Sequence, residues 1–223
     1  MSDTQSETPY LRQLQLGPMS NFVYLVGPAD GPEAAVIDPA WDVDAIIAAA
    51  ERDGRRLESV FLSHHHHDHM NGLGALLARL DLPVYVQRSE ADFATPLRPF
   101  SQAVRPVGPG DVVQVGSMPV TCIHTPGHTP GSQCLLCAGS LVSGDTVFVD
   151  ACGRCDLPGG DAGQMFDSLH RVLGALGDET RLYPGHDYGD VESSTLGRER
   201  QQNPYFKLRA VHDFVAYRLR PRG

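Results

Sequence analysis

Short apolar stretches alternate with polar turns along most of the chain. Stretches rich in β-branched and aromatic residues, bounded by Gly, Pro or polar residues, are typical of β-strands. They predict strands at residues 22–26, 35–37, 60–62, 84–86, 112–115, 120–123, 134–137 and 141–142. Apolar residues at helical spacing predict helices at 43–50, 72–80, 164–176 and 207–219. Strands dominate the middle of the chain and helices flank them, so the pattern predicts a layered α/β domain.

The amino-acid composition limits the classes of molecule that the protein is expected to bind. The chain has 223 residues, of which 41% are hydrophobic, and this length can bury a sizeable core in one domain. Its 18 Lys and Arg against 27 Asp and Glu give a net charge of −9. That balance argues against nucleic acid or an anionic membrane as the main partner, because both attract a basic surface. No apolar stretch is long enough to span a membrane.

Two features of the sequence concern the cellular compartment. Residues 1–7 are polar and lack the basic and apolar regions of a secretory signal peptide. Five cysteines are an odd number at low density, which favours a reducing compartment over a disulfide framework. We therefore expect a cytoplasmic protein. Cys134 and Cys137 lie three apart on a predicted strand and should face opposite sides, so they cannot hold one ion together.

A run of histidines follows the predicted strand at 60–62. Five of the ten histidines in the chain lie between residues 64 and 69. In an extended segment His64 and His66 point the same way and can hold one ion, whereas Asp68 and His69 lie beyond them and suit a second. Imidazole and carboxylate groups are ligands of Zn²⁺, and also of Fe²⁺ or Mn²⁺. The spacing therefore predicts a metal site at this strand end.

Three other turns carry residues of the same kind. His128, Asp145 and His186 each follow a strand-like stretch, in a turn that contains Gly or Pro. Strand ends converge at one edge of a sheet, so these turns should meet the histidine run there. We expect structural roles for the remaining histidines, which are His65, His67, His124, His170 and His212. The basic residues of the C-terminal stretch could anchor an anionic substrate tail or a partner subunit, but they are more typical of a solvated helix face.

These ordered motifs resemble the metallo-β-lactamase superfamily, and within it the glyoxalase II-like (hydroxyacylglutathione hydrolase-like) branch, from about Asn21 to Pro204. The resemblance implies an αββα sandwich, with residues 1–223 forming a single domain. It also implies two divalent cations, most typically Zn²⁺. His64, His66 and His128 would hold the first cation, and Asp68, His69 and His186 the second. Asp145 would bridge the two.

The activity implied by the resemblance is hydrolysis, in which a metal-bound hydroxide cleaves a thioester or related acyl bond of a small molecule. Asp68 and Asp145 would be the catalytic carboxylates. Arg154, in a Gly-containing loop, is a candidate anchor for a substrate carboxylate, and Tyr188 a candidate substrate contact. Metallo-β-lactamases proper lack the bridging Asp, so a lactonase or weak β-lactamase is an alternative only as a side activity. A non-enzymatic metal-binding module is disfavoured, because these ligands leave an open cleft.

Hydrolysis has one stronger alternative. Glyoxalase II enzymes continue into a C-terminal helical domain that helps to bind glutathione, and we expect no such domain here. Persulfide dioxygenases also lack it, and the run from Cys152 to Asp156 is similar to a segment of that branch. In a dioxygenase one iron would be held by His64, His128 and Asp145 and would oxidise glutathione persulfide. Cys152 and Cys155 would then be either persulfide-handling residues or simple free thiols.

Overall fold

The computed structural model describes residues 8–220, so the signal-peptide expectation for residues 1–7 lies outside the described residues. Six strands form the first sheet: β1 Tyr10–Leu16, β2 Asn21–Gly27, β3 Glu33–Ile37, β4 Arg56–Phe61, β5 Val84–Gln87 and β6 Val104–Val107. Six more form the second sheet: β7 Val112–Val115, β8 Met118–His124, β9 Gln133–Cys137, β10 Ser140–Gly144, β13 Arg181–Pro184 and β14 Ser194–Thr195. A short hairpin consists of β11 Val147–Phe148 and β12 Ala151–Cys152.

Helices occupy the segments between and after these strands. The α-helices are α1 Val43–Arg52, α2 His67–Met70, α3 Leu73–Leu77, α4 Arg88–Phe93, α5 Ala162–Asp167, α6 Leu196–Gln202, α7 Pro204–Lys207 and α8 Val211–Arg218. Three tighter or wider helical turns are η1 Thr95–Phe100, η2 Ser168–Val172 and η3 Leu173–Ala175. Helix α1 begins where the Asp42 carboxylate accepts a hydrogen bond from the Ala45 amide, and it buries Val43, Ile46 and Ala49 against the first sheet.

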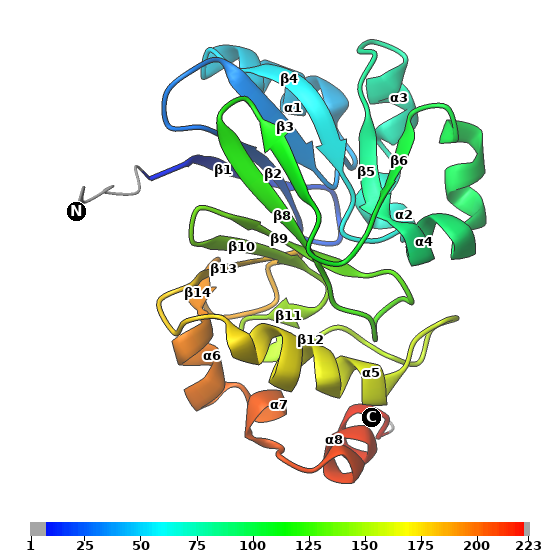
Figure 1. Ribbon diagram of the computed structural model, residues 1–223, viewed down its shortest axis with the longest axis vertical. Helices are drawn as coiled ribbons and strands as arrows, with labels where there is room; N and C mark the ends of the chain where they lie inside the picture. The colour runs from blue at the N-terminus through cyan, green and yellow to red at the C-terminus, as the bar shows by residue number, and fades with distance from the viewer. Residues whose placement is uncertain (1–7, 221–223) are drawn as a thin grey trace.

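Two sheets packed face to face, with helices on both outer sides, form the predicted αββα sandwich (Figure 1). The strands run in the orders β1-β2-β3-β4-β5-β6 and β14-β13-β10-β9-β8-β7. The middle apolar cluster joins the inner faces of the two sheets through residues such as Phe61 and Leu135. Two outer clusters pack the first sheet against α1 and α3, and the second sheet against α5 and α8. The architecture is therefore a single layered domain, as the sequence pattern predicts.

The eight predicted strands all occur, with slightly different ends, whereas three predicted helices are wrong in extent. The expected helix at 72–80 is the shorter α3. The expected helix at 164–176 is α5 followed by the π turn η2 and the 3₁₀ turn η3. The expected helix at 207–219 is interrupted, because Leu208 and Ala210 have extended backbone angles and α8 starts only at Val211. This break turns the chain so that Phe214 enters the outer cluster under the second sheet.

The expectation for Cys134 and Cys137 is confirmed. Both side chains are buried, but Cys134 belongs to the outer cluster and Cys137 to the cluster between the sheets. Cys122, Cys134, Cys137 and Cys155 form no disulfide bond.

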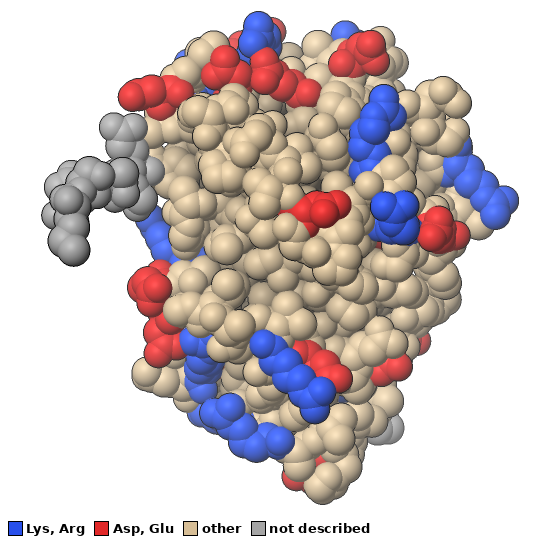
Figure 2. All heavy atoms as spheres, viewed as in Figure 1, with Lys and Arg blue, Asp and Glu red and all other residues tan. Residues whose placement is uncertain are grey.

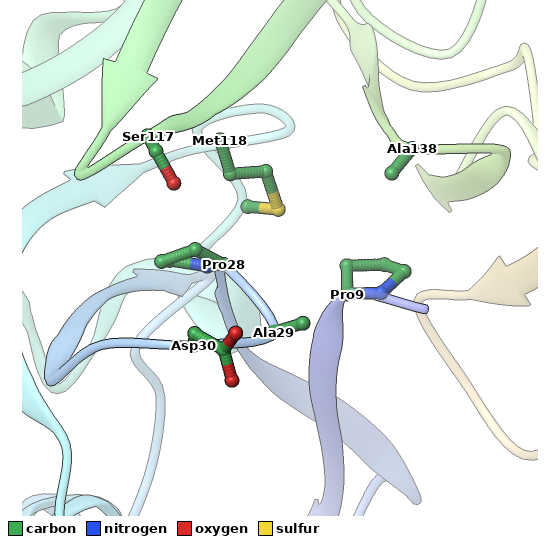
Figure 3. A pocket seen from close by; sticks show the side chains of 7 residues that line it. All are labelled: Pro9, Pro28, Ala29, Asp30, Ser117, Met118 and Ala138. Carbon is green, nitrogen blue, oxygen red and sulfur yellow. The ribbon is translucent and has the colours of Figure 1, made fainter. Parts of the chain in front are cut away.

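The surface drawn in Figure 2 carries acidic and basic side chains in mixed groups around a mostly uncharged centre. At one end of the strands, a hollow of about 300 Å³ lies beside Pro28, Met118 and Ala138 (Figure 3). Asp30 and Ser117 bring the only side-chain oxygens among the residues that line it. The histidine-bearing loops lie at the opposite end of these strands. Within residues 8–220, no helix is long and apolar enough to cross a membrane.

The cluster between the sheets sets the stability of the domain. Phe61 is fully buried there and stacks on Tyr85, with ring centroids 5.2 Å apart. We expect Phe61→Ala to lower the free energy of unfolding by about 3–5 kcal/mol, because it leaves a cavity between the sheets. Val112→Ala, at a site that is 52% exposed, should change it by less than about 1 kcal/mol. Urea denaturation measures both changes, and equal effects would contradict this assignment of the core.

Candidate metal centre

All seven residues predicted as ligands lie at one end of the two sheets. His64 and His66 follow β4, Asp68 and His69 lie in or beside α2, and His128 lies in the loop between β8 and β9. Asp145 follows β10, and His186 follows β13. Six of them form two groups, in each of which the ligand atoms lie within 4.8 Å of one another. The first cluster is His64, His66 and His128, and the second cluster is Asp68, His69 and His186.

Outer hydrogen bonds orient the rings of the first cluster. His128 donates through Nδ1 to the carbonyl oxygen of Arg154 at 2.7 Å, and its Nε2 lies 2.9 Å from His66 Nδ1. His64 donates through Nδ1 to the hydroxyl of Ser63 at 3.0 Å. This leaves the buried Nε2 of His64 without a hydrogen-bond partner. A lone pair at this position is available to a cation.

The second cluster is oriented in the same way. His69 donates through Nδ1 to Asp38 at 3.0 Å, and His186 donates through Nδ1 to the carbonyl oxygen of Met19 at 2.9 Å. The two Nε2 atoms then face each other at 3.1 Å. Asp68 brings Oδ2 to 3.4 Å from Nε2 of His186. Two imidazole lone pairs this close repel unless a proton or a cation lies between them.

Asp145 lies between the two clusters. Its Oδ1 is 3.2 Å from Nε2 of His69, and its Oδ2 is 3.4 Å from Nε2 of His128. The preceding Gly144 has a φ of +48°, and a Cβ there would lie 2.5 Å from Ser63, so glycine is required for the turn that aims Asp145 inward. The carboxylate thus touches one histidine from each cluster, in the place predicted for a bridging ligand.

The pKa shifts differ between the two clusters. In the second cluster burial lowers the pKa of His69, but the neighbouring Asp145 and Asp38 outweigh it, so the net shift is well upward. In the first cluster the shifts are downward. Burial, and then the charge of His69, hold the pKa of His64 well below its ordinary value. Burial and the neighbouring His128 lower the pKa of His66 to about 4. Burial raises the pKa of Asp145, but the nearby His69, His186 and His128 outweigh it, so the net shift is well downward. Asp145 is therefore ionised, and His64 and His66 are neutral ligands at neutral pH.

These observations fit divalent cations. The donors are imidazoles and carboxylates, which suit Zn²⁺, Fe²⁺ and Mn²⁺. The buried Nε2 of His64 and Oδ1 of Asp145 have no hydrogen-bond partner among the described residues. A cation in each cluster would satisfy these atoms and separate the facing nitrogens of His69 and His186.

Two supporting residues were missed by the sequence analysis. Asp38 is buried, has a φ of +53°, and accepts hydrogen bonds from the amide and hydroxyl of Ser63 as well as from His69. Asn21 donates to Oδ2 of Asp68 at 3.0 Å and accepts from the indole nitrogen of Trp41 at 2.9 Å. Their only sequence signal is a polar residue at the end or start of an apolar strand.

The remaining histidines are not in either cluster. His65 points away toward Glu90, and His67 is exposed beside the Trp41 ring. His124 contacts the carbonyl oxygen of Pro130, His170 that of Tyr205, and His212 an adjacent acid on α8.

A cavity of about 580 Å³ opens onto both clusters. Arg154 and Tyr188, the predicted substrate contacts, both line it. The Tyr188 ring is 56% exposed and stacks on His186, with centroids 4.5 Å apart. Arg154 is bound through Nε and Nη2 to Asp156, at 2.8 Å for each nitrogen. A substrate carboxylate would have to compete with Asp156 for this guanidinium.

The expectation of a solvated basic face on the C-terminal helix is wrong for Arg218. Its side chain is buried, donates through Nε to the carbonyl oxygen of Gly153 at 2.8 Å, and lines the same cavity. The break before α8 makes this possible, because it redirects the helix toward the second sheet. The cavity therefore has two guanidinium groups on its wall.

Comparison with known proteins agrees with this geometry. The family model described as the metallo-beta-lactamase superfamily matches residues 16–186. The chain belongs to this superfamily. Its members bind metal ions, which accords with the two clusters.

Relatives within the superfamily are named for several different activities. A probable polyketide biosynthesis zinc-dependent hydrolase, PksB of Bacillus subtilis, is 30% identical over 90% of this chain and 88% of its own length. A hydroxyacylglutathione hydrolase of Alkalilimnicola ehrlichii is 39% identical, over 75% of this chain and 62% of its own length. The solved structure of ETHE1 from Myxococcus xanthus is 33% identical, with a TM-score of 0.85 over 96% of this chain and 92% of that one.

Cation binding should stabilise the fold, since the clusters exist only in the folded chain. At free zinc of about 100 times the Kd, each occupied cluster should add about 2.7 kcal/mol to the free energy of unfolding. His64→Ala should reduce this gain, whereas His212→Ala, on the surface of α8, should preserve it. Unfolding of metal-depleted protein, measured with zinc and with a chelator, provides the test. Identical midpoints in the two conditions would argue against a metal centre.

Proposed function

We propose that the protein is a glyoxalase II-like hydrolase with two divalent cations, most typically Zn²⁺, which cleaves a thioester or related acyl bond of a small molecule. The observation that carries the proposal is the position of Asp145, whose two carboxylate oxygens face His69 of one cluster and His128 of the other. A carboxylate shared in this way is expected where two cations lie side by side. The similarity to hydroxyacylglutathione hydrolases supports the choice of bond.

In this proposal His64, His66 and His128 would hold one cation, and Asp68, His69 and His186 would hold the other, with Asp145 as a further ligand. Bound divalent cations lower the pKa of water and polarise a carbonyl oxygen, which is the chemistry that acyl hydrolysis needs. Asp38, Ser63 and the carbonyl oxygens of Met19 and Arg154 fix the imidazole rings so that their free nitrogens face inward.

The other residues of the cavity act on substrate and water. The Asp68 side chain is 15% exposed at the cavity wall, and Asn21 holds its Oδ2, so its carboxylate can accept a proton from water that enters. Tyr188 and the two arginines, Arg154 and Arg218, offer a ring face and cationic donors to the substrate.

A second candidate function has its own support. A persulfide dioxygenase with one iron would use His64, His128 and Asp145, which lie together here, and leave the second cluster without a cation. The similarity to ETHE1, a persulfide dioxygenase neighbour, favours this alternative. Cys152 and Arg154 belong to the segment that is similar to persulfide dioxygenases, and both line the cavity.

Elemental analysis of protein purified without added metal distinguishes the two candidates. About two zinc ions, or zinc and iron, per chain together with hydrolysis of thioesters would support the hydrolase. About one iron per chain, together with oxygen uptake in the presence of glutathione persulfide, would overturn it in favour of the dioxygenase. A panel of lactones and β-lactams assesses side activities.

Substitution of the two carboxylates gives an independent prediction. Asp145→Ala should lower kcat/KM by about 100-fold or more under either candidate function, because both use this group. Asp68→Ala should remove one of two cations from a hydrolase but leave most of the iron in a dioxygenase. Asp44→Ala, whose carboxylate is exposed and pairs only with Arg79, is the matched control and should keep full activity. Full turnover by Asp145→Ala would refute both functions.

A further inference from the structure

A third carboxylate lies close to the metal centre but outside both clusters. Glu90, in α4, is completely buried. It does not line the cavity, and its hydrogen bonds go to residues beside the predicted ligands rather than to the ligands themselves. The proposed chemistry does not use it. A buried carboxylate is costly unless hydrogen bonds compensate for its lost hydration.

Glu90 accepts hydrogen bonds from four donor groups in two loops. His65 donates its amide, at 2.8 Å, and its ring Nδ1, at 2.5 Å, both to Oε1. The Thr129 hydroxyl lies 2.9 Å from each carboxylate oxygen, and the Gly131 amide donates to Oε2 at 2.8 Å. One loop follows β4 in the first sheet, and the other joins β8 to β9 in the second. The Glu90 carboxylate therefore ties the two sheets together.

These two loops supply the whole first cluster. His65 lies between His64 and His66, and Thr129 directly follows His128. His65 points away from the centre and is hydrogen-bonded to Glu90. This bond holds the segment in which its neighbours, His64 and His66, point inward. The spacing across the loops is short, because His66 Nδ1 and His128 Nε2 are only 2.9 Å apart. A small displacement of one loop would change the geometry that three nitrogen ligands offer to a cation.

The second loop also approaches Glu90 unusually closely. A Cβ on Gly131 would lie 2.2 Å from the backbone nitrogen of Glu90, so only glycine permits the loop to reach the helix. The contact therefore depends on two residues, namely Glu90 on α4, which supplies the carboxylate, and Gly131, which has no side chain to keep the loop away.

We propose that Glu90 is a positioning residue for the first cluster, which sets the separation between the His64–His66 segment and His128 and so controls cation affinity there. This inference rests on the proposed metal-dependent function. It predicts that loss of the carboxylate weakens the first cluster selectively and leaves the second cluster, whose rings are held by Asp38 and Met19, largely unchanged.

The chain contains a matched control. Glu199, in α6, is also completely buried. Its carboxylate accepts hydrogen bonds from the Asp150 amide, the Ser194 hydroxyl, the Arg198 guanidinium and the Asn203 amide group. None of these donors lies next to a residue of either cluster. Glu199→Gln therefore reproduces the structural cost of changing a buried carboxylate without touching the ligand loops.

The experiment compares zinc binding by metal-depleted wild type, Glu90→Gln and Glu199→Gln, titrated against a chromophoric chelator. A glutamine keeps the size of the side chain but places an NH₂ group against donors that need an acceptor. We expect Glu90→Gln to weaken one of the two zinc-binding events by about 10–100-fold, as is typical when a supporting partner is lost. In Glu199→Gln both events should stay within about threefold of wild type. The same comparison in an Asp68→Ala background, which disables the second cluster, assigns the affected event to the first.

Thr129→Val provides a milder variant that retains the carboxylate and removes one donor. It should weaken the same event by about three- to tenfold, and it keeps the proposal testable where Glu90→Gln does not fold. Unchanged affinity in the folded variants, or an equal loss in Glu199→Gln, would overturn the positioning role while leaving the metal-dependent function intact. A wild-type chain that binds no zinc, iron or manganese would overturn both.

Discussion

The structure depends on one electrostatic constraint, namely that several electron-rich groups must converge in a small buried space. The facing nitrogens of His69 and His186 are 3.1 Å apart, and Asp145 lies against them. Such an arrangement repels itself unless positive charge is present. Hydrogen bonds on the outer side of the centre hold four of the histidine rings in place against this repulsion. Their acceptors belong to Asp38, Ser63, Met19 and Arg154. The two sheets in turn hold these acceptors at fixed separation.

Much of the centre could be predicted from the sequence, because its residues follow strand-like stretches and strand ends meet at one edge of a sheet. The supporting residues could not, since their function depends on partners far away in the chain. Asp38 is 31 residues from His69, and Asn21 is 47 residues from Asp68. Strands β1 and β6 were missed for a related reason. Most residues of β1 are only partly buried, and half of those in β6 are exposed, so their polar positions mask the apolar pattern.

The C-terminal segment illustrates a different limit of sequence patterns. Apolar spacing extends from Lys207 to Leu219 as if one helix occupied it, yet the chain breaks at Leu208 to Ala210. Tertiary packing decides the matter, because Phe214 gains more by entering the outer cluster than a continuous helix would gain by propensity. The same break delivers Arg218 to the cavity wall. A residue typical of a solvated helix face thereby becomes part of the site.

The chain has a single tryptophan, and its position links it to the metal centre. The indole nitrogen of Trp41 donates to Asn21, whose amide group in turn holds Asp68 of the second cluster. A change in the charge or position of Asp68 is thus transmitted through two hydrogen bonds to one fluorophore. We therefore expect the tryptophan emission of the protein to respond to that half of the centre, without any added label.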